Sequence, residues 1–459
     1  MKFLYYDLIF LAAFCIFVFV FLRINRKKIQ REGIVFLYRT KVGLKFIDSI
    51  AKKFKKILDS VGWVSIILGF IMMVLMFYLL IQTIILTAAI PMSAPPILPL
   101  FPYVPQAFNL PLPPFYFTYW IVIIVIIAVV HEFAHGIFAR HDKIKVKSTG
   151  FGFLGPFLAA FVEPDEKQLV KKKNKQQLEI FSAGSFSNLV FAAIFMLILQ
   201  LFFVLAYQPA GLSYSYAYNQ INVSEIQSIG NYSIDGFLNL STKQLAEINT
   251  TLALRTANAT YYVDPGLIQQ ISQSKRIIAK YHLIPAYGEE PAFNAGLKGG
   301  IEKINGIKIK STNDLSNVLS TTKPGDTITV ETSEGTYQVR LAQNPLNSSK
   351  SYMGIYFSKS TILSSLTAPY FSPGMEVKSR GNEQTTTFFR DLLVWLVLIG
   401  FLVALFNMLP VGFLDGGRMF FILGLVVTGS KKKAKTWLTV ASYIVLLIIL
   451  AMLFVWIIG

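Results

Sequence analysis

Two histidines and a glutamate lie close together in a segment that otherwise has the composition of a membrane span. The segment, residues 121–140, reads IVIIVIIAVVHEFAHGIFAR and contains His131, Glu132 and His135. On a helix, residues four apart project from one face, so both histidines can bind one metal ion while Glu132 acts on a metal-bound water. Ionisable groups are costly inside a bilayer. Three of them in five residues therefore indicate function rather than two packed core histidines and a stray glutamate.

A catalytic zinc site usually takes three protein ligands and keeps a fourth position open, so a third ligand is required. Asp415 is the candidate, within the sequence NMLPVGFLDGG at residues 407–417. Pro410 should end or kink the preceding helix, and the two glycines after Asp415 permit a sharp turn. Asp415 could instead cap a short helix expected at residues 416–427, and the two roles can coexist.

The composition indicates a polytopic membrane protein. Of the 459 residues, 54% are hydrophobic and 14% are aromatic, far more than in a soluble protein of this length. The net charge of +18 does not indicate a nucleic-acid partner, because 25 of the 43 lysines and arginines lie in three segments beside spans, residues 23–56, 140–181 and 431–435. The single cysteine, Cys15, lies in an apolar run and excludes an intrachain disulfide.

Six segments are long and apolar enough to cross a bilayer as helices. They are residues 3–22, 61–90, 117–139, 180–207, 389–409 and 437–458, the first of which is expected to be a retained anchor. If the three basic segments are cytosolic, both termini lie outside and the histidines lie nearer the cytosolic face. The basic segment 23–56 should then be solvated and touch anionic head groups. His141, just past the third span, is likewise expected to be solvated.

An uncharged segment, residues 148–162, follows the third span. It is too short to cross the bilayer and contains three glycines and a proline. Irregular backbone at membrane depth is tolerated only where protein or water satisfies its polar groups. We therefore expect a re-entrant or hairpin segment directed toward the metal.

Residues 208–388 are polar and lie outside by the parity of the spans. They contain six N-x-S/T sequons, at Asn222, Asn231, Asn239, Asn249, Asn258 and Asn347. Residues 291–342 alternate short β-like runs with Asn-Gly and Pro-Gly-Asp turns around one helix at 311–320. This pattern is similar to a PDZ domain, in which an extended peptide adds to a sheet edge, although the usual Gly-Asp after the Gly-Leu turn is missing. We expect a PDZ-like domain at 279–388, after an insertion at 208–278. Peptide termini are candidate ligands of this domain, and the sequence leaves open whether it binds them.

The motifs together resemble the site-2 protease family of intramembrane zinc metalloproteases. They are HEFAH at 131–135, FVEPDE at 161–166, GSFSN at 184–188 and NMLPVGFLDGG at 407–417, together with the PDZ-like segment. The resemblance implies one Zn²⁺ ion held by His131, His135 and Asp415, with Glu132 as the catalytic glutamate.

Two asparagines are candidates for substrate or oxyanion support. The family's Gly-Pro-x-x-Asn is Gly-Ser-x-x-Asn here, which ends at Asn188. Asn407 begins the segment that carries the aspartate. An amide beside the metal could donate to the oxyanion that develops during peptide hydrolysis.

The expected architecture is a polytopic α-helical membrane protein with about six transmembrane helices, a re-entrant segment and an inserted mainly-β soluble domain. The expected parts are 1–116 (two-span anchor), 117–207 (first catalytic part), 208–278 (insertion), 279–388 (PDZ-like) and 389–459 (second catalytic part). The expected activity is hydrolysis of peptide bonds within or near transmembrane helices of other proteins in the cell membrane, as in regulated intramembrane proteolysis. A zinc peptidase for soluble or lipidated peptides and a catalytically silent binder of membrane helices stay open as alternatives.

Overall fold

Six long helices dominate the first of two compact units. The computed structural model describes residues 2–89, 94–108, 110, 112–155, 157–357 and 375–458. The first unit comprises the N-terminal part up to residue 89 with residues 94–197 and 391–458, and the second centres on residues 198–390.

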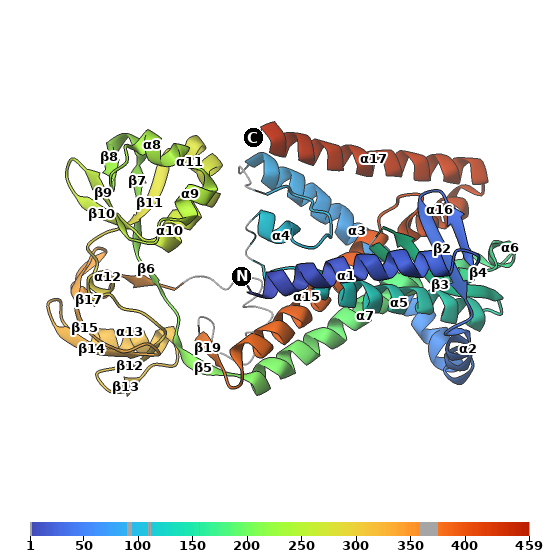
Figure 1. The fold of residues 1–459 in the computed structure, drawn as a ribbon, viewed down its shortest axis with the longest axis horizontal. Helices are drawn as coiled ribbons and strands as arrows, with labels where there is room; N and C mark the ends of the chain where they lie inside the picture. Colours follow the sequence, from blue (N-terminus) through green and yellow to red (C-terminus); the bar gives the residue numbers. More distant parts are fainter. Residues whose placement is uncertain are drawn as a thin grey trace. The chain divides into compact units, whose positions relative to one another are not determined.

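Among the described residues, six helices are long and apolar enough to cross a membrane, so each predicted span is found as a helix (Figure 1). They are α1 (Lys2–Ile24), α3 (Lys55–Ala89), α5 (Phe117–His141), α7 (Asn174–Ala206), α15 (Glu383–Asn407) and α17 (Lys431–Ile458). Four shorter helices are α2 (Leu44–Lys53), α4 (Val104–Ala107), α6 (Glu166–Leu169) and α16 (Asp415–Thr428). The last of these matches the short helix expected at 416–427.

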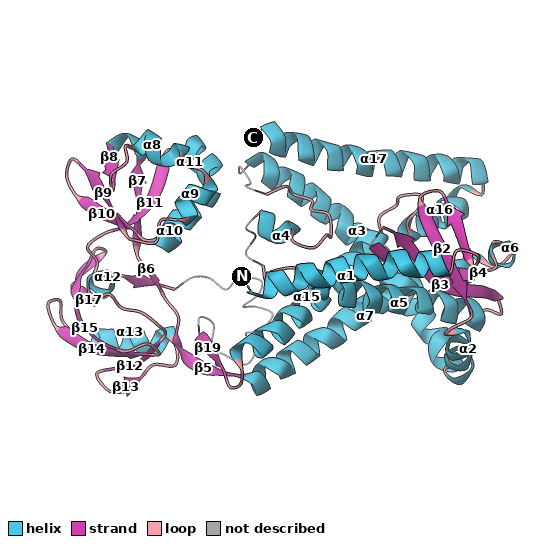
Figure 2. Cartoon of the chain, viewed as in Figure 1, coloured by secondary structure: helices cyan, strands magenta, loops and turns pink. Residues whose placement is uncertain are grey.

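One antiparallel sheet of four strands accompanies these helices (Figure 2). In spatial order its strands are β1 (Ile29–Glu32), β2 (Val35–Thr40), β3 (Val146–Leu154) and β4 (Phe157–Pro164). The segment expected to be re-entrant or a hairpin therefore takes the hairpin form. Strand β3 of this hairpin also pairs with β2, from Phe36↔Phe153 to Thr40↔Thr149, so the backbone groups on that side of the hairpin have partners.

The basic segment 23–56 was expected to be a solvated cytosolic segment, and its secondary structure was not expected. It supplies β1, β2 and α2, and Ile47 of α2 is fully buried. Ile47 and Val162 of β4 both pack against Gly136 of α5, in the space that a side chain at this position would fill. The backbone groups of the β3–β4 hairpin need partners, and β2 provides them.

The N-terminus of α5 is capped by a side chain from another helix. Asp7 of α1 is only 2% exposed, and its carboxylate accepts hydrogen bonds from the backbone N–H groups of Phe117 and Thr118, each at 2.8 Å. The hydroxyl of Tyr103 donates to the same carboxylate at 2.5 Å. The first N–H groups of a helix lack partners within the helix. Asp7 thus fixes the start of the helix that carries the two histidines.

The second unit contains two larger sheets. The first has five strands in the order β7-β11-β10-β9-β8. Its elements are β7 (Tyr218–Asn222), β8 (Ile226–Ile229), β9 (Leu252–Thr256), β10 (Thr260–Val263), β11 (Leu283–Tyr287), α8 (Ile234–Asn239), α9 (Thr242–Ala246), α10 (Pro265–Gln273), α11 (Lys275–Tyr281) and a 3-10 turn, Val223–Glu225.

The second sheet follows the order β15-β14-β12-β5-β19, and β13 also pairs with β12. Its elements are β5 (Tyr207–Leu212), β12 (Ile301–Ile304), β13 (Ile307–Lys308), β14 (Thr327–Thr332), β15 (Thr336–Arg340), β19 (Met375–Ser379), α12 (Pro291–Asn294) and α13 (Thr312–Ser320). The helix expected at 311–320 is α13. Two small pairs join β16 (Ala342–Asn344) to β17 (Asn347–Tyr352) and β6 (Ser215–Tyr216) to β18 (Ile355–Tyr356).

The boundary expected between residues 278 and 279 differs from the observed one. It falls inside α11, and Ile284 and Ala286 of β11 are buried in the core of the five-stranded sheet. Leu212 of β5, which was assigned to the insertion, is instead buried in the core of the other sheet. The five-stranded sheet is therefore an insertion between β6 and α12, because strands from both sides of it complete the second sheet.

Candidate metal centre

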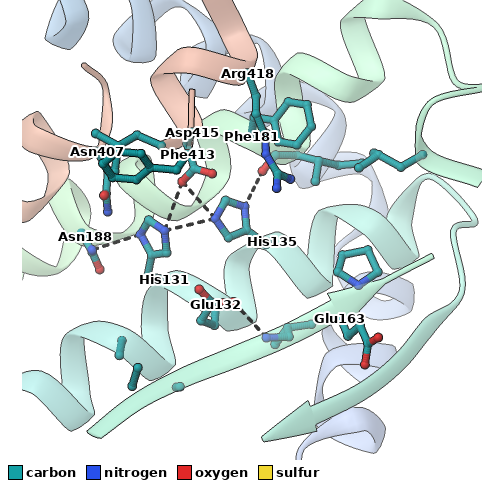
Figure 3. A pocket seen from close by; sticks show the side chains of 18 of the residues that line it. His131, Glu132, His135, Glu163, Phe181, Asn188, Asn407, Phe413, Asp415 and Arg418 are labelled. Atoms are coloured by element: carbon teal, nitrogen blue, oxygen red, sulfur yellow. Dashed lines mark hydrogen bonds and ion pairs between the residues drawn. The ribbon is translucent and has the colours of Figure 1, made fainter. Parts of the chain in front are cut away.

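Three side chains from two distant parts of the chain converge on one point (Figure 3). The Nε2 atoms of His131 and His135 are 3.1 Å apart, and each lies 3.2 Å from Oδ2 of Asp415. All three side chains are largely buried, with 10%, 12% and 17% of their surface exposed. The predicted ligand set is thus brought together.

Local backbone geometry explains why each ligand reaches this point. His131 and His135 lie one turn apart on α5, as their spacing predicts. Asp415 is the first residue of α16, and its side chain faces the histidines instead of capping the helix. The two following glycines are needed because a Cβ on Gly416 would lie 2.1 Å from the Met408 carbonyl oxygen, and one on Gly417 would lie 2.0 Å from that of Val411.

The donor set fits a zinc ion. Bonds of about 2.0 Å in a tetrahedral site place ligand atoms about 3.3 Å apart, close to the observed separations. Two imidazole nitrogens and a carboxylate oxygen are electron-pair donors, and a cation offsets their mutual repulsion. The outer nitrogen of His135 also has the partner expected of a metal ligand, since Nδ1 lies 2.6 Å from the carbonyl oxygen of Ile180.

Gly184 of α7 leaves the space that the ligands occupy. A Cβ at this position would lie 2.4 Å from Nε2 of His135 and 2.6 Å from Nε2 of His131. From sequence, the small residues of this segment could be read as sites of close helix packing. Here the missing side chain brings the α7 backbone directly against both ligands.

Glu132 is held by the β-hairpin. Its Oε2 accepts a hydrogen bond of 2.9 Å from the backbone N–H of Val162 in β4, and Figure 3 shows it directed toward that strand. No hydrogen bond from another described residue reaches its other oxygen. The hairpin expected near the metal therefore positions the predicted catalytic base.

The two asparagines are placed differently. Asn188 is fully buried on α7, with Nδ2 lying 3.2 Å from Nδ1 of His131. Asn407, at the end of α15, lines the cavity beside the metal centre, and no hydrogen bond joins its side chain to any other described residue. Both lie near the site, but Asn188 contacts His131 through its amide, whereas the amide of Asn407 has no hydrogen bond to a described residue.

A cavity of about 750 Å³ opens beside these residues. Its apolar lining residues include Ile124, Ile127, Ala128, Ala160 and Val403, and its charged lining residues include Lys147, Glu163, Glu166, Lys167 and Arg418. A hydrogen bond from Ser148 and the neighbouring Arg39 guanidinium hold the pKa of Glu163 below its ordinary value. The cavity is therefore lined by both apolar and charged side chains.

The structure changes the interpretation of one residue outside the ligand set, His141, and adds another, Asp7, that the sequence analysis did not consider. His141 was expected to be solvated, yet its side chain is only 7% exposed, and its Nε2 lies 3.0 Å from Oδ1 of Asp59. Sequence reasoning also missed Asp7. The signal was present, because one carboxylate within an apolar run of span length needs a partner inside the protein.

Comparison with known proteins places this geometry in a family. The profile of peptidase family M50 matches residues 119–452, which include both histidines, the hairpin and Asp415. An uncharacterised protein of Methanocaldococcus jannaschii is 37% identical over 169 residues, covering 34% of this chain and 41% of that protein. The chain thus matches less than half the length of this relative. With a family profile spanning most of its length and the full donor set assembled, the chain belongs to peptidase family M50, the membrane metalloproteases of the site-2 protease family.

Proposed function

We propose that this protein is an intramembrane zinc metalloprotease that hydrolyses peptide bonds within or near transmembrane helices of other membrane proteins. The observation that carries the proposal is the convergence of His131, His135 and Asp415 beside Glu132. The two histidines and the glutamate lie on α5, a helix long enough to span a membrane. The basic residues after α5 favour a cytosolic position for the nearby end of the cavity, with both termini outside.

The chain's own residues account for the proton transfers and the charge stabilisation. When bound, zinc supplies a Lewis acid that polarises the scissile carbonyl and lowers the pKa of a water molecule. Glu132 accepts the proton of the attacking water and returns it to the leaving nitrogen. The free amide of Asn407 can donate to the developing oxyanion. Regulated intramembrane proteolysis is the biological process that this chemistry would serve.

The hairpin offers a way to hold a substrate in extended form. β4 pairs with β3 on one side only, and the N–H of Val162 points to the other side, toward Glu132. Backbone groups alternate in direction along an antiparallel strand, so Ala160 directs its N–H and C=O the same way. Ala160 also lines the cavity. A substrate segment that unwinds and pairs here would expose a carbonyl that a helix would shield.

The decisive experiment pairs metal analysis with cleavage of a helical membrane substrate in liposomes. We expect the wild type to cut the substrate, and Glu132→Gln to hold zinc equally well but to be inactive. Cleavage of only soluble or lipidated peptides would replace the proposal with a membrane-embedded peptidase. A wild type that retains no zinc and cuts nothing would indicate a catalytically silent binder of membrane helices.

We also propose that the sheet containing β5 and β12 to β15 is the PDZ-like domain and that it binds peptide termini of substrates. The order of its strands and the helix α13 support this assignment. Binding of fluorescent peptides with free or amidated C-termini to the full chain tests it. A preference for the free carboxylate is expected, and equal weak binding of both peptides would contradict it.

A further inference from the structure

Asn188 lies against the side of His131 that faces away from the other ligands. His131 directs Nε2 toward Asp415 and His135, while its Nδ1 lies 3.2 Å from Nδ2 of Asn188. The asparagine is 0% exposed, and its Oδ1 has no hydrogen-bond partner among the described residues. Among the described residues, the only polar contact of this buried amide is therefore with the outer nitrogen of a predicted metal ligand.

Metal binding by His131 determines which kind of hydrogen-bond partner its outer nitrogen, Nδ1, requires. A neutral histidine that binds a metal through Nε2 carries its proton on Nδ1 and needs a hydrogen-bond acceptor there. An amide nitrogen cannot accept this proton, whereas an amide oxygen can. The nitrogen and oxygen of an asparagine amide are nearly identical in shape, and their assignment follows from the hydrogen-bond network. Whichever of the two atoms faces His131, the other faces away from it. The need of His131 for an acceptor therefore determines that the oxygen of the Asn188 amide faces the histidine.

We propose that Asn188 is a positioning residue whose Oδ1 accepts the Nδ1 proton of His131 and so keeps Nε2 directed at the metal. The inference rests on the proposed zinc site. It gives both histidines equivalent support, because the carbonyl oxygen of Ile180 already lies 2.6 Å from Nδ1 of His135. It also assigns different roles to the two asparagines: Asn188 positions a metal ligand, and Asn407 is the candidate donor to the oxyanion.

The test compares two substitutions at this position by zinc affinity, measured on the full chain in detergent by competition with a chromophoric chelator. Asn188→Ala removes the acceptor and should weaken zinc binding about 10-fold to 100-fold, as loss of such partners does elsewhere. Asn188→Asp keeps an acceptor and should bind zinc at least as tightly as the wild type. Ser187→Ala is the matched control, since the Ser187 hydroxyl donates to the carbonyl oxygens of Val130 and Gly184 and not to a side chain of the predicted ligand set.

The alternative, a donor to the oxyanion, predicts the opposite pattern. Both substitutions would then leave zinc affinity unchanged and lower kcat, because an aspartate cannot donate. Unchanged zinc affinity in Asn188→Ala, or equal losses in both variants, overturns the proposal. If the alanine variant does not fold, Asn188→Asp alone tests the proposal. Zinc affinity and kcat like those of the wild type support a positioning role, and a loss of kcat refutes it. If no substrate is ever cut, the zinc affinities still test this inference while the proposed function fails.

Discussion

Gly184→Ala is the most selective perturbation that the metal centre offers. The added Cβ would lie 2.4 Å from Nε2 of His135 and 2.6 Å from Nε2 of His131, whereas atoms in contact normally stay about 3.5 Å apart. At least one imidazole must therefore move by roughly 1 Å, which exceeds the tolerance of about 0.2 Å for metal-ligand distances. The substitution should remove one ligand without changing any ligand residue.

The expected loss can be estimated from structural zinc sites. Their binding free energies of about 10–16 kcal/mol, divided over four ligands, give about 3 kcal/mol per ligand, or roughly a 100-fold loss of affinity. The helix itself should gain, because alanine is better than glycine in a helix interior by about 1 kcal/mol. A weakened zinc site in a protein that is not destabilised without metal is the expected signature.

The assay is chelator competition for zinc, combined with thermal unfolding of the metal-free protein. Gly400→Ala on α15 is the matched control, because a Cβ there would have Ala192 at 3.4 Å and the backbone oxygen of Asn188 at 3.7 Å as its nearest neighbours, which are ordinary contact distances. It should leave zinc affinity unchanged. A Gly184→Ala protein that binds zinc as tightly as the wild type would refute the close approach of α7 to the ligands.

Three further perturbations test other parts of the site. Asp415→Asn should lower zinc affinity while Glu132→Gln does not, and equal retention of zinc by both variants would exclude Asp415 as the third ligand. Asp7→Ala should lower the stability of the protein by about 1–2 kcal/mol through loss of the α5 cap, seen as a lower Tm against Cys15→Ala as a control. The lowered pKa of Glu163 means that its interactions contribute fully above its ordinary value of 4.5 and are lost as the pH falls through the lowered value. The Tm difference between wild type and Glu163→Gln should therefore be present at pH 7 and shrink in acid, and a difference that grows in acid would contradict this sign.

Sequence reasoning succeeded where the signal is local. The six helices follow from runs of apolar residues, and His131 and His135 follow from the spacing of one helical turn. Asp415 was found because a proline and two glycines mark an irregular turn beside it. In each case the residues that determine the structure are neighbours in the chain.

It failed where the determining residues are far apart. The pairing of β2 with β3 joins residues more than 100 positions apart, and nothing in the basic composition of 23–56 announces a strand. The nesting of the five-stranded sheet between β6 and α12 is likewise a matter of strand pairing, which sequence alternation does not specify. The contact of Asn188 with His131 depends on the rotation of α7 against α5, which small residues permit without fixing.

The centre is held largely by backbone atoms, and this decides which substitutions it can tolerate. Asp7 binds two N–H groups at the start of α5, Glu132 binds the N–H of Val162, and Nδ1 of His135 lies against the carbonyl oxygen of Ile180. A change of side chain at Val162 or Ile180 preserves these backbone partners. A side chain added at Gly184 pushes directly on the ligands. The geometry should therefore be more sensitive to small residues gaining atoms than to apolar residues being exchanged, because close approach of the main chain positions both the base and a ligand.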